Sequence, residues 1–277
     1  MKKRKIARVG VAIIMGGVVC VAAYFLFLGR NRPAPIPAKE TLYEDVTYQR
    51  VVRYFPNAMI AHIIKIDTKT KGIQFLITPA DSKSETPLNA RTTSQFLDEF
   101  GLQIAINGDG FTPWWSRGPA DYYPHAGDPV APLGFTASNG DDYWQGVELE
   151  QGERPTLYIS RRNAFSFNDK PNKVYNAISG DRMIVLQGQP VAGLDDSELN
   201  PRTAIGLNRN GRYVYLIVVD GRQPFYSAGI TFADLAQLLI DYDVYAAMSL
   251  DGAGPSTLVM DGENSEPVIL NSPIDNY

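Results

Sequence analysis

The residues with the clearest chemical potential lie in the stretch YAAMSLDGAGPSTLVMD, residues 245–261. One apolar run ends in Asp251 and Gly252, and a second apolar run begins after Ser256 and Thr257. Short apolar runs bounded by glycine and proline indicate buried strands joined by a tight connection. A carboxylate, two hydroxyls and several backbone N–H groups would then meet at one end of a sheet. The alternative is an ordinary polar turn, because Asp, Gly, Pro and Ser are common turn residues.

Two further apolar runs end in polar residues followed by glycine. Residues 102–106 lead into Asn107 and Asp109, and the strand-like run 213–219 leads into Asp220. Asn-Gly is also a common hairpin signal, so the first junction has a plain turn as its alternative. Polar loops at strand ends are frequent ligand sites. We therefore expect the three junctions to form one site.

The N-terminus has the pattern of a membrane anchor. Residues 1–8 carry five basic side chains and form a predicted cytoplasmic tail, and residues 9–28 contain no charge. A helix of this length crosses the hydrocarbon core of a bilayer, and a signal peptide usually has a shorter apolar region. We predict a single-pass transmembrane anchor over 9–29, a Pro-rich linker over 30–46 and a catalytic domain over 47–277. Because positive charge stays inside, that domain should be periplasmic or extracellular.

Charge and cysteine content restrict the partners of the predicted domain. Residues 1–32 hold seven of the 26 Lys and Arg and none of the 30 Asp and Glu, so the remainder carries a formal charge of −11. Nucleic acid is therefore not an expected partner, and an anionic substrate must meet locally placed arginines such as Arg202 and Arg222. Cys20, the one cysteine, lies in the apolar segment. The domain should fold without disulfides.

The apolar patterns predict an α+β fold with a mixed β-sheet core and a few helices. Strands are expected over 58–67 and 73–77, and a β-rich insert of antiparallel strands over 140–180. Thr92 is a predicted helix cap, and Thr231 is the predicted N-cap of a helix with an apolar stripe.

Histidines and a cluster of aromatic residues in a loop leave other functions open. His62 lies in an apolar run, where a buried, hydrogen-bonded histidine is the expected reading. His125 follows a loop that contains Trp114, Trp115 and Tyr122. These aromatic rings would suit stacking on a sugar or a small satellite core.

Four ordered segments resemble the phosphodiester glycosidase family: IAINGDGF (104–111), PRTAIGLN (201–208), VVDGR (218–222) and MSLDGAGPSTLVM (248–260). The resemblance implies a mixed α/β fold whose motifs converge on one pocket. It also implies hydrolysis of a sugar-1-phosphodiester at the anomeric C1–O bond. The family's Asn-Gly-Gly is replaced here by a sequence with Asp109, and its Asp-Gly-Gly-Gly-Ser-Ser by one with Pro255.

Glycosidases usually use two carboxyl groups, and Asp220 and Asp251 are the candidate pair, with Asp109 in reserve. Bidentate arginines suit a phosphate group. The resemblance places seven residues at the site: Asn107, Arg202, Asp220, Arg222, Asp251, Ser256 and Thr257. We predict Asp220, Asp251 and Asn107 as catalytic residues. The predicted substrate-binding residues are Arg202, Arg222, Ser256 and Thr257, together with Thr203, Gly252 and Asp109.

No cofactor and no metal ligand set is expected, and the expected partners are a sugar-phosphate or glycan substrate and the membrane. A metal-dependent phosphodiesterase is one alternative, although His62 and His125 lack the usual ligand spacing. The other alternative is a membrane-tethered glycan-binding module that uses Trp114, Trp115 and Tyr122.

Overall fold

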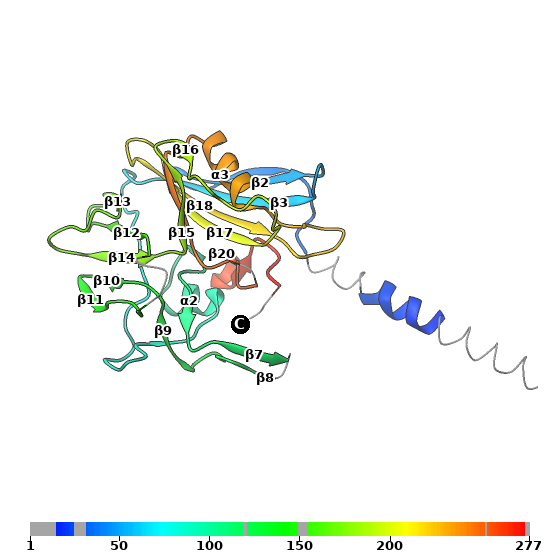
Figure 1. Cartoon of the computed structure of the whole chain (residues 1–277), viewed down its shortest axis with the longest axis horizontal. Helices are drawn as coiled ribbons and strands as arrows, with labels where there is room; N and C mark the ends of the chain where they lie inside the picture. Colours follow the sequence, from blue (N-terminus) through cyan, green and yellow to red (C-terminus); the bar gives the residue numbers. More distant parts are fainter. Residues whose placement is uncertain (1–14, 25–31, 119–120, 149–153, 253, 275–277) are drawn as a thin grey trace, which may run out of the picture. The chain divides into compact units, whose positions relative to one another are not determined.

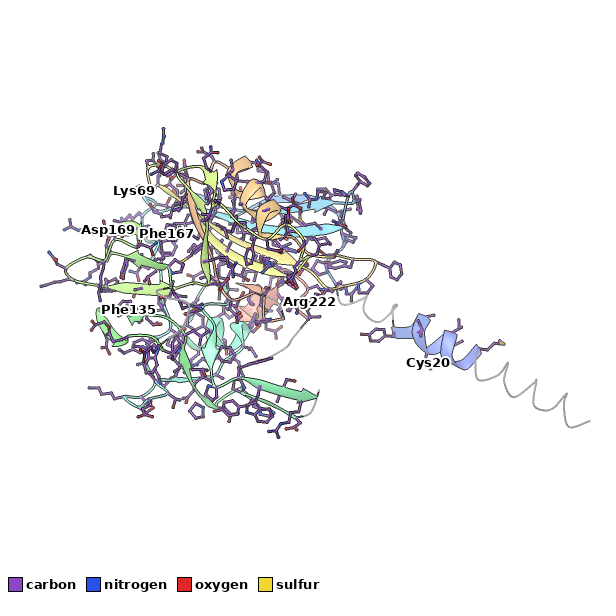
Figure 2. The ribbon with its side chains drawn as sticks, viewed as in Figure 1. Cys20, Lys69, Phe135, Phe167, Asp169 and Arg222 are labelled. Atoms are coloured by element: carbon purple, nitrogen blue, oxygen red, sulfur yellow. The ribbon has the colours of Figure 1, made fainter. Side chains whose placement is uncertain are left out.

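The structure is a computed structural model, and it describes residues 15–24, 32–118, 121–148, 154–252 and 254–274. The chain divides into two compact units, Met1–Ala34 and Pro35–Tyr277. Within the first unit, residues 15–24 are helical, and Val18, Val19 and Cys20 are exposed on this helix (Figure 2). None of the described helices is long and apolar enough to cross a membrane. The predicted anchor extends over 9–14 and 25–29, which lie outside the described residues.

The centre of the second unit is an eight-stranded antiparallel sheet (Figure 1). Its first and last pairs of strands are hairpins, while β19 lies between strands from distant parts of the chain. The strands, in order across the sheet, are β1 (Ala38–Tyr43), β2 (Val46–Arg53), β3 (Met59–Asp67), β18 (Tyr213–Asp220), β17 (Arg202–Leu207), β19 (Ala246–Ser249), β15 (Arg182–Leu186) and β16 (Gln189–Pro190).

Helix α3 (Phe232–Asp241) covers one face of this sheet. Thr231 caps it, because the Thr231 hydroxyl accepts a hydrogen bond from the N–H of Asp234. Its buried stripe packs on alternate residues of β3 and β18, as the period-2 geometry of strands requires. The predicted helix and its apolar face are confirmed.

A second layer of strands covers the opposite face. Leu157, Ile159 and Leu258 pack there against Ile64, Val218 and their neighbours. Most of this layer is a five-stranded antiparallel sheet, which matches the predicted β-rich insert. Its strands, in order, are β11 (Asp141–Trp144), β10 (Thr136–Ser138), β14 (Asn176–Ser179), β12 (Thr156–Ile159) and β13 (Phe165–Phe167).

A three-stranded sheet and helix α2 (Thr93–Glu99) form a smaller core around Leu97, Ala105 and Val259. Thr92 and Gln95 make a reciprocal capping box at the start of α2, which confirms the predicted cap at Thr92. The sheet has the order β21 (Pro267–Ile269), β20 (Leu258–Asp261) and β5 (Ile104–Ile106), and the short helix η1 (Glu263–Ser265) lies between β20 and β21.

Two small sheets complete the unit. One has the order β4 (Leu88–Asn89), β9 (Pro129–Pro132) and β6 (Phe111–Thr112). The other is the hairpin of β7 (Trp115–Gly118) and β8 (Asp121–Tyr123), which lies between β6 and β9 in the sequence.

The α+β class is confirmed, but three local predictions differ from the structure. The paired strands run antiparallel, where a mixed sheet was predicted. Residues 73–77 are not a strand, because side chains bind their backbone: the carbonyls of Ile73, Phe75 and Ile77 accept hydrogen bonds from other segments. Strand β1 lies inside the predicted 30–46 linker and pairs with β2.

Candidate active site

Asn107 joins three of the predicted motifs through its side-chain amide. Its Nδ2–H donates to the Asp251 carbonyl at 2.7 Å. Its Oδ1 accepts from the Thr203 hydroxyl at 2.7 Å and from the Thr257 N–H at 3.1 Å. Strand β5, the start of β17 and the loop between β19 and β20 therefore meet at this residue. The structure brings Asn107, Thr203, Asp251 and Thr257 together, as the motif order predicted.

The loop from Asp251 to Thr257 is not a hairpin turn, because β19 and β20 belong to different sheets. Asp251 is partly buried, and its backbone N–H donates to the carbonyl of Gly108 at 3.0 Å. Burial, and then the negative charge of Asp109, raise the pKa of the Asp251 carboxyl to about 6. A carboxyl group with this pKa exchanges protons near neutral pH, which suits acid–base catalysis.

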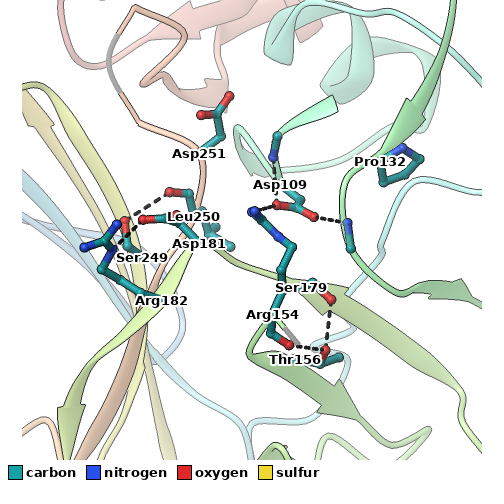
Figure 3. Close-up of polar contacts among 12 residues, drawn as sticks. Asp109, Pro132, Arg154, Thr156, Ser179, Asp181, Arg182, Ser249, Leu250 and Asp251 are labelled. Atoms are coloured by element: carbon teal, nitrogen blue, oxygen red, sulfur yellow. Dashed lines mark hydrogen bonds and ion pairs between the residues drawn. The ribbon is translucent and has the colours of Figure 1, made fainter. Parts of the chain in front are cut away.

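Asp109 lies on the other side of the same site and is tied down by Arg154 (Figure 3). Its two carboxylate oxygens accept from the N–H groups of Gly110 and Gly134, each at 2.8 Å, and from Arg154 Nη2 at 2.5 Å. Burial raises the pKa of Asp109, while these donors act in the opposite direction. Three hydrogen-bond donors hold the Asp109 carboxylate in place, and its negative charge acts on the nearby Asp251.

Asp220 occupies a different environment, because it is the last residue of β18 and is buried in the interior. Its side chain is 0% exposed. One oxygen lies 3.0 Å from His62 Nε2, and the other accepts from Asn271 Nδ2 at 3.0 Å and from the Ser272 N–H at 2.8 Å. The second nitrogen of His62 contacts the Tyr48 hydroxyl at 2.8 Å, so the expected buried, hydrogen-bonded histidine is found.

This network connects Asp220 to the site only indirectly. The Asn271 side chain that donates to Asp220 also donates to the Ser256 carbonyl at 2.8 Å, and its oxygen accepts from the Leu258 N–H. The charges that shift the pKa of Asp251 are those of Asp109, Arg154 and Asp181. Asp251 is thus paired with Asp109, whereas Asp220 contacts Asn271, which in turn holds the backbone of Ser256 and Leu258.

The two arginines assigned to phosphate lie in unlike positions. Arg202 is partly buried with its guanidinium 3.6 Å from the centre of the Phe232 ring, and burial lowers its pKa. Gly252 lies against it: a Cβ built on Gly252 would be 3.8 Å from Arg202 Cδ. Arg222 is exposed, as Figure 2 shows, and its Nε donates to Asn200 Oδ1 at 2.8 Å.

The hydroxyl groups of Ser256 and Thr257 also lie in different environments. The Thr257 hydroxyl donates to the Pro255 carbonyl at 2.8 Å. The Ser256 Oγ is buried, and within the part of the chain that the structure describes it has no hydrogen-bond partner. An unpaired buried hydroxyl is costly, so Ser256 is the better candidate for contact with a bound molecule.

The aromatic residues of the predicted loop lie on and beside the β7–β8 hairpin. Trp114 and Trp115 are 60% and 39% exposed, and Trp115 stacks on Tyr123 with ring centres 6.3 Å apart. The ring of Tyr122 lies 4.3 Å from that of His125. The described residues contain no group of three or more His, Cys, Asp and Glu arranged to hold a metal ion.

Sequence reasoning missed Arg154, Asp181 and Arg182. Arg154 lies inside the predicted β-rich insert, in which no chemistry was expected. Asp181 precedes β15 and Arg182 begins it, and no functional role was expected for this strand. No spacing pattern relates these residues to the motifs: β15 reaches the site by pairing with a distant strand, β19, and Arg154 reaches it through its ion pair with Asp109.

Comparison with known proteins identifies the family. The phosphodiester glycosidase profile matches residues 100–277, so the chain belongs to the phosphodiester glycosidase family. A 64-residue stretch is 39% identical to N-acetylglucosamine-1-phosphodiester alpha-N-acetylglucosaminidase from Bos taurus. That stretch spans 23% of this chain and 12% of the bovine enzyme.

Solved structures share the fold at low sequence identity. The catalytic domain of zebrafish N-acetylglucosamine-1-phosphodiester alpha-N-acetylglucosaminidase has a TM-score of 0.57 at 17% identity, over 90% of this chain and 87% of that one. A hypothetical protein from Synechocystis also gives 0.57, at 14% identity over 87% of this chain and 62% of that one. An exported protein from Burkholderia pseudomallei gives 0.53, at 13% identity over 79% and 72%.

The buried network predicts that Asp220 contributes more to stability than an exposed aspartate does. The change Asp220→Asn would set an amide N–H₂ against existing donors, and we expect it to lower the free energy of unfolding by about 2–4 kcal/mol. Asp234→Asn is the matched control, because Asp234 forms only a partly exposed ion pair with Arg53, and losing it should cost less than about 1 kcal/mol. Urea unfolding of both variants measures this. Equal midpoints for wild type and Asp220→Asn would contradict the structural role.

Proposed function

We propose that this protein is a hydrolase that cleaves the C1–O bond of a sugar-1-phosphodiester, releasing a free sugar and a phosphate monoester. Family membership supports the reaction class. The observation that carries the proposal is the carboxyl group of Asp251, which has a raised pKa caused in part by the charge of Asp109. The next residue, Gly252, lies against Arg202.

Asp251 is the general base in this proposal. At neutral pH its carboxylate is mostly ionised, yet it is a stronger base than an exposed aspartate. A water molecule bonds to C1 as one of its protons passes to Asp251. The C1–O bond breaks and its electron pair remains on the phosphate oxygen. Asp251 then returns the proton to solvent, which restores the enzyme.

Asp109 supports this step without contacting the proton. Its charge keeps the pKa of Asp251 high, and Arg154 holds it in place. The second carboxylate in this proposal is therefore Asp109 and not Asp220, because the Asp220 side chain is fully buried. Asp220, like Asn107, acts as a positioning residue for the loop that carries Asp251 and Ser256.

The phosphate departs toward Arg202. A phosphate monoester is a good leaving group, because its second pKa lies near 6, so stabilising its negative charge matters more than protonating it. A guanidinium donates paired hydrogen bonds to phosphate oxygens and keeps its charge at all working pH values. Ser256 contributes a buried hydroxyl to the sugar or to the phosphate.

The proposed substrate is a glycan or glycoconjugate of the cell envelope. We retain a membrane anchor over 9–29 that keeps the catalytic domain periplasmic or extracellular. The apolar side chains exposed on the helix over 15–24 support an anchor. The sequence asymmetry of basic residues supports the orientation.

Product analysis tests the function. The full chain in detergent is incubated with N-acetylglucosamine-1-phosphodiester and glucose-1-phosphodiester compounds, with and without EDTA. We expect free sugar in both conditions, and a loss of about 10²–10⁴ in kcat/KM for Asp251→Asn. Asp243→Asn, an exposed aspartate at a positive-φ turn where Asn is well tolerated, should keep wild-type activity.

Other products would support the alternatives. Sugar-1-phosphate with a free alcohol, abolished by EDTA, would indicate P–O cleavage at a metal site. Saturable glycan binding without turnover, unaffected by Asp251→Asn, would favour a binding module that uses the aromatic hairpin.

The pH dependence of kcat/KM tests the base. A base must be ionised, so kcat/KM should rise about tenfold per pH unit below pH 6 and level off above it. Asp109→Asn removes a neighbouring negative charge, lowers the pKa of Asp251 and should move the inflection to lower pH. A rate that falls as the pH rises through 6 would instead make Asp251 an acid. An inflection unmoved in Asp109→Asn would contradict the pairing of the two carboxyl groups.

A further inference from the structure

Two arginines from different strands share one aromatic ring beside the site. The guanidinium carbon of Arg202 lies 3.6 Å from the centre of the Phe232 ring, and that of Arg182 lies 4.7 Å from it. Phe232 is the first residue of α3 and is buried. Contacts of this kind hold a guanidinium in a fixed place while leaving its N–H groups available.

Sheet register explains why the two side chains meet. Arg182 in β15 pairs with Ser249 in β19, and Ser249 pairs with Ala204 in β17. Arg202 lies two residues before Ala204, so both arginines are on the face of the sheet that α3 covers. The meeting is therefore built into the central sheet.

The two positively charged guanidinium groups lie close together and have few hydrogen-bond partners. Arg182 Nε donates to Asp181 at 2.7 Å, and Arg202 Nε has only a long contact, 3.5 Å, to the Ile230 carbonyl. Among the described residues, no acceptor contacts the terminal amino groups of either guanidinium. Burial and the charge of Arg182 both lower the pKa of Arg202. A bound anion would relieve this repulsion and satisfy the open donors.

The arginine pair adjoins the proposed catalytic carboxylate. Gly252 lies against Arg202, one residue from Asp251. The negative charge of Asp181 raises the pKa of both Asp251 and Arg202, so Asp181 is near each group. Figure 3 shows Asp181 and its partner Arg182 in the same view as Asp251. An anion held by both arginines would therefore lie on the side of the site where Gly252 meets Arg202.

We propose that Arg182 and Arg202, fixed by Phe232, form a two-arginine clamp for the phosphate group of the substrate. Arg182 is then a specificity residue that nothing in the family motifs supplies. Asp181 is the resident counterion that Arg182 keeps when no phosphate is bound. The clamp rests on the proposed function, because it takes the phosphate of the same sugar-1-phosphodiester.

The direct test is binding of inorganic phosphate and glucose-1-phosphate to the full chain by calorimetry. Loss of one charged hydrogen-bonding partner should weaken binding by about tenfold or more in Arg182→Gln, and Arg182→Lys should recover part of the loss. Arg209→Gln is the matched control. Arg209 is exposed and contacts an aromatic ring, Tyr245, but lies beyond the opposite end of β17, and it should bind like wild type. Equal affinities for wild type and Arg182→Gln would overturn the clamp.

Kinetics separate the clamp from the proposed function. If the clamp is correct, Arg182→Gln raises KM for a sugar-1-phosphodiester more than it lowers kcat. Phosphate binding that depends on Arg182, in a protein that hydrolyses nothing, would keep the clamp and reject the function. Wild-type turnover with the same KM in Arg182→Gln would keep the function and reject the clamp.

Discussion

The site depends on the side-chain amide of Asn107. This one group donates to the carbonyl of Asp251 and accepts from the hydroxyl of Thr203 and the N–H of Thr257. It thereby fixes a small sheet, the central sheet and the loop between them at one point. Partly buried polar atoms need such partners, so the amide can be satisfied only when all three segments are in place. Positioning of Asp251 is in this way a direct consequence of folding.

The electrostatics of the site follow from where its carboxyl groups are buried. Asp220 is also buried, but His62, Asn271 and a backbone N–H surround its two oxygens. Asp109 has Arg154 and two backbone donors. Asp251 shares the negative field of Asp109 without an equal set of donors, and its pKa is raised to about 6. Of these three aspartates, Asp251 has the weakest set of hydrogen-bond donors, and it is therefore the one best suited to exchange a proton.

Local patterns in the sequence predicted much of the fold. Apolar stripes and caps identified α2, α3, β3, β18 and the β-rich insert, because period and capping are properties of neighbouring residues. Residues 73–77 have the composition of a strand, but side chains from Asn163, Asn176 and Ser138 bind their carbonyls. Such competition comes from distant segments and leaves no local pattern.

For the candidate site too, local patterns in the sequence identified some residues and missed others. Asn107, Asp251 and Thr257 were found because glycine-bearing motifs mark strand ends. Thr203 was predicted from the PRTAIGLN segment, and the structure joins all four residues. Arg154 and Arg182 have no motif, since only sheet pairing and loop packing bring them to Asp251. The sequence also grouped Asp220 with Asp251 by motif similarity, although whether a carboxylate faces solvent or the interior depends on what packs over it.

Hydrolysis in water enriched in oxygen-18 tests the central claim most directly. The account predicts that the wild-type chain, acting on a sugar-1-phosphodiester, places the heavy oxygen in the C1 hydroxyl of the released sugar and none in the phosphate monoester. The sugar must be analysed before its C1 oxygen exchanges with solvent, with unlabelled sugar added as a control for exchange. Heavy oxygen in the phosphate would mean attack at phosphorus and would contradict the assignment of Asp251 to a water that attacks carbon.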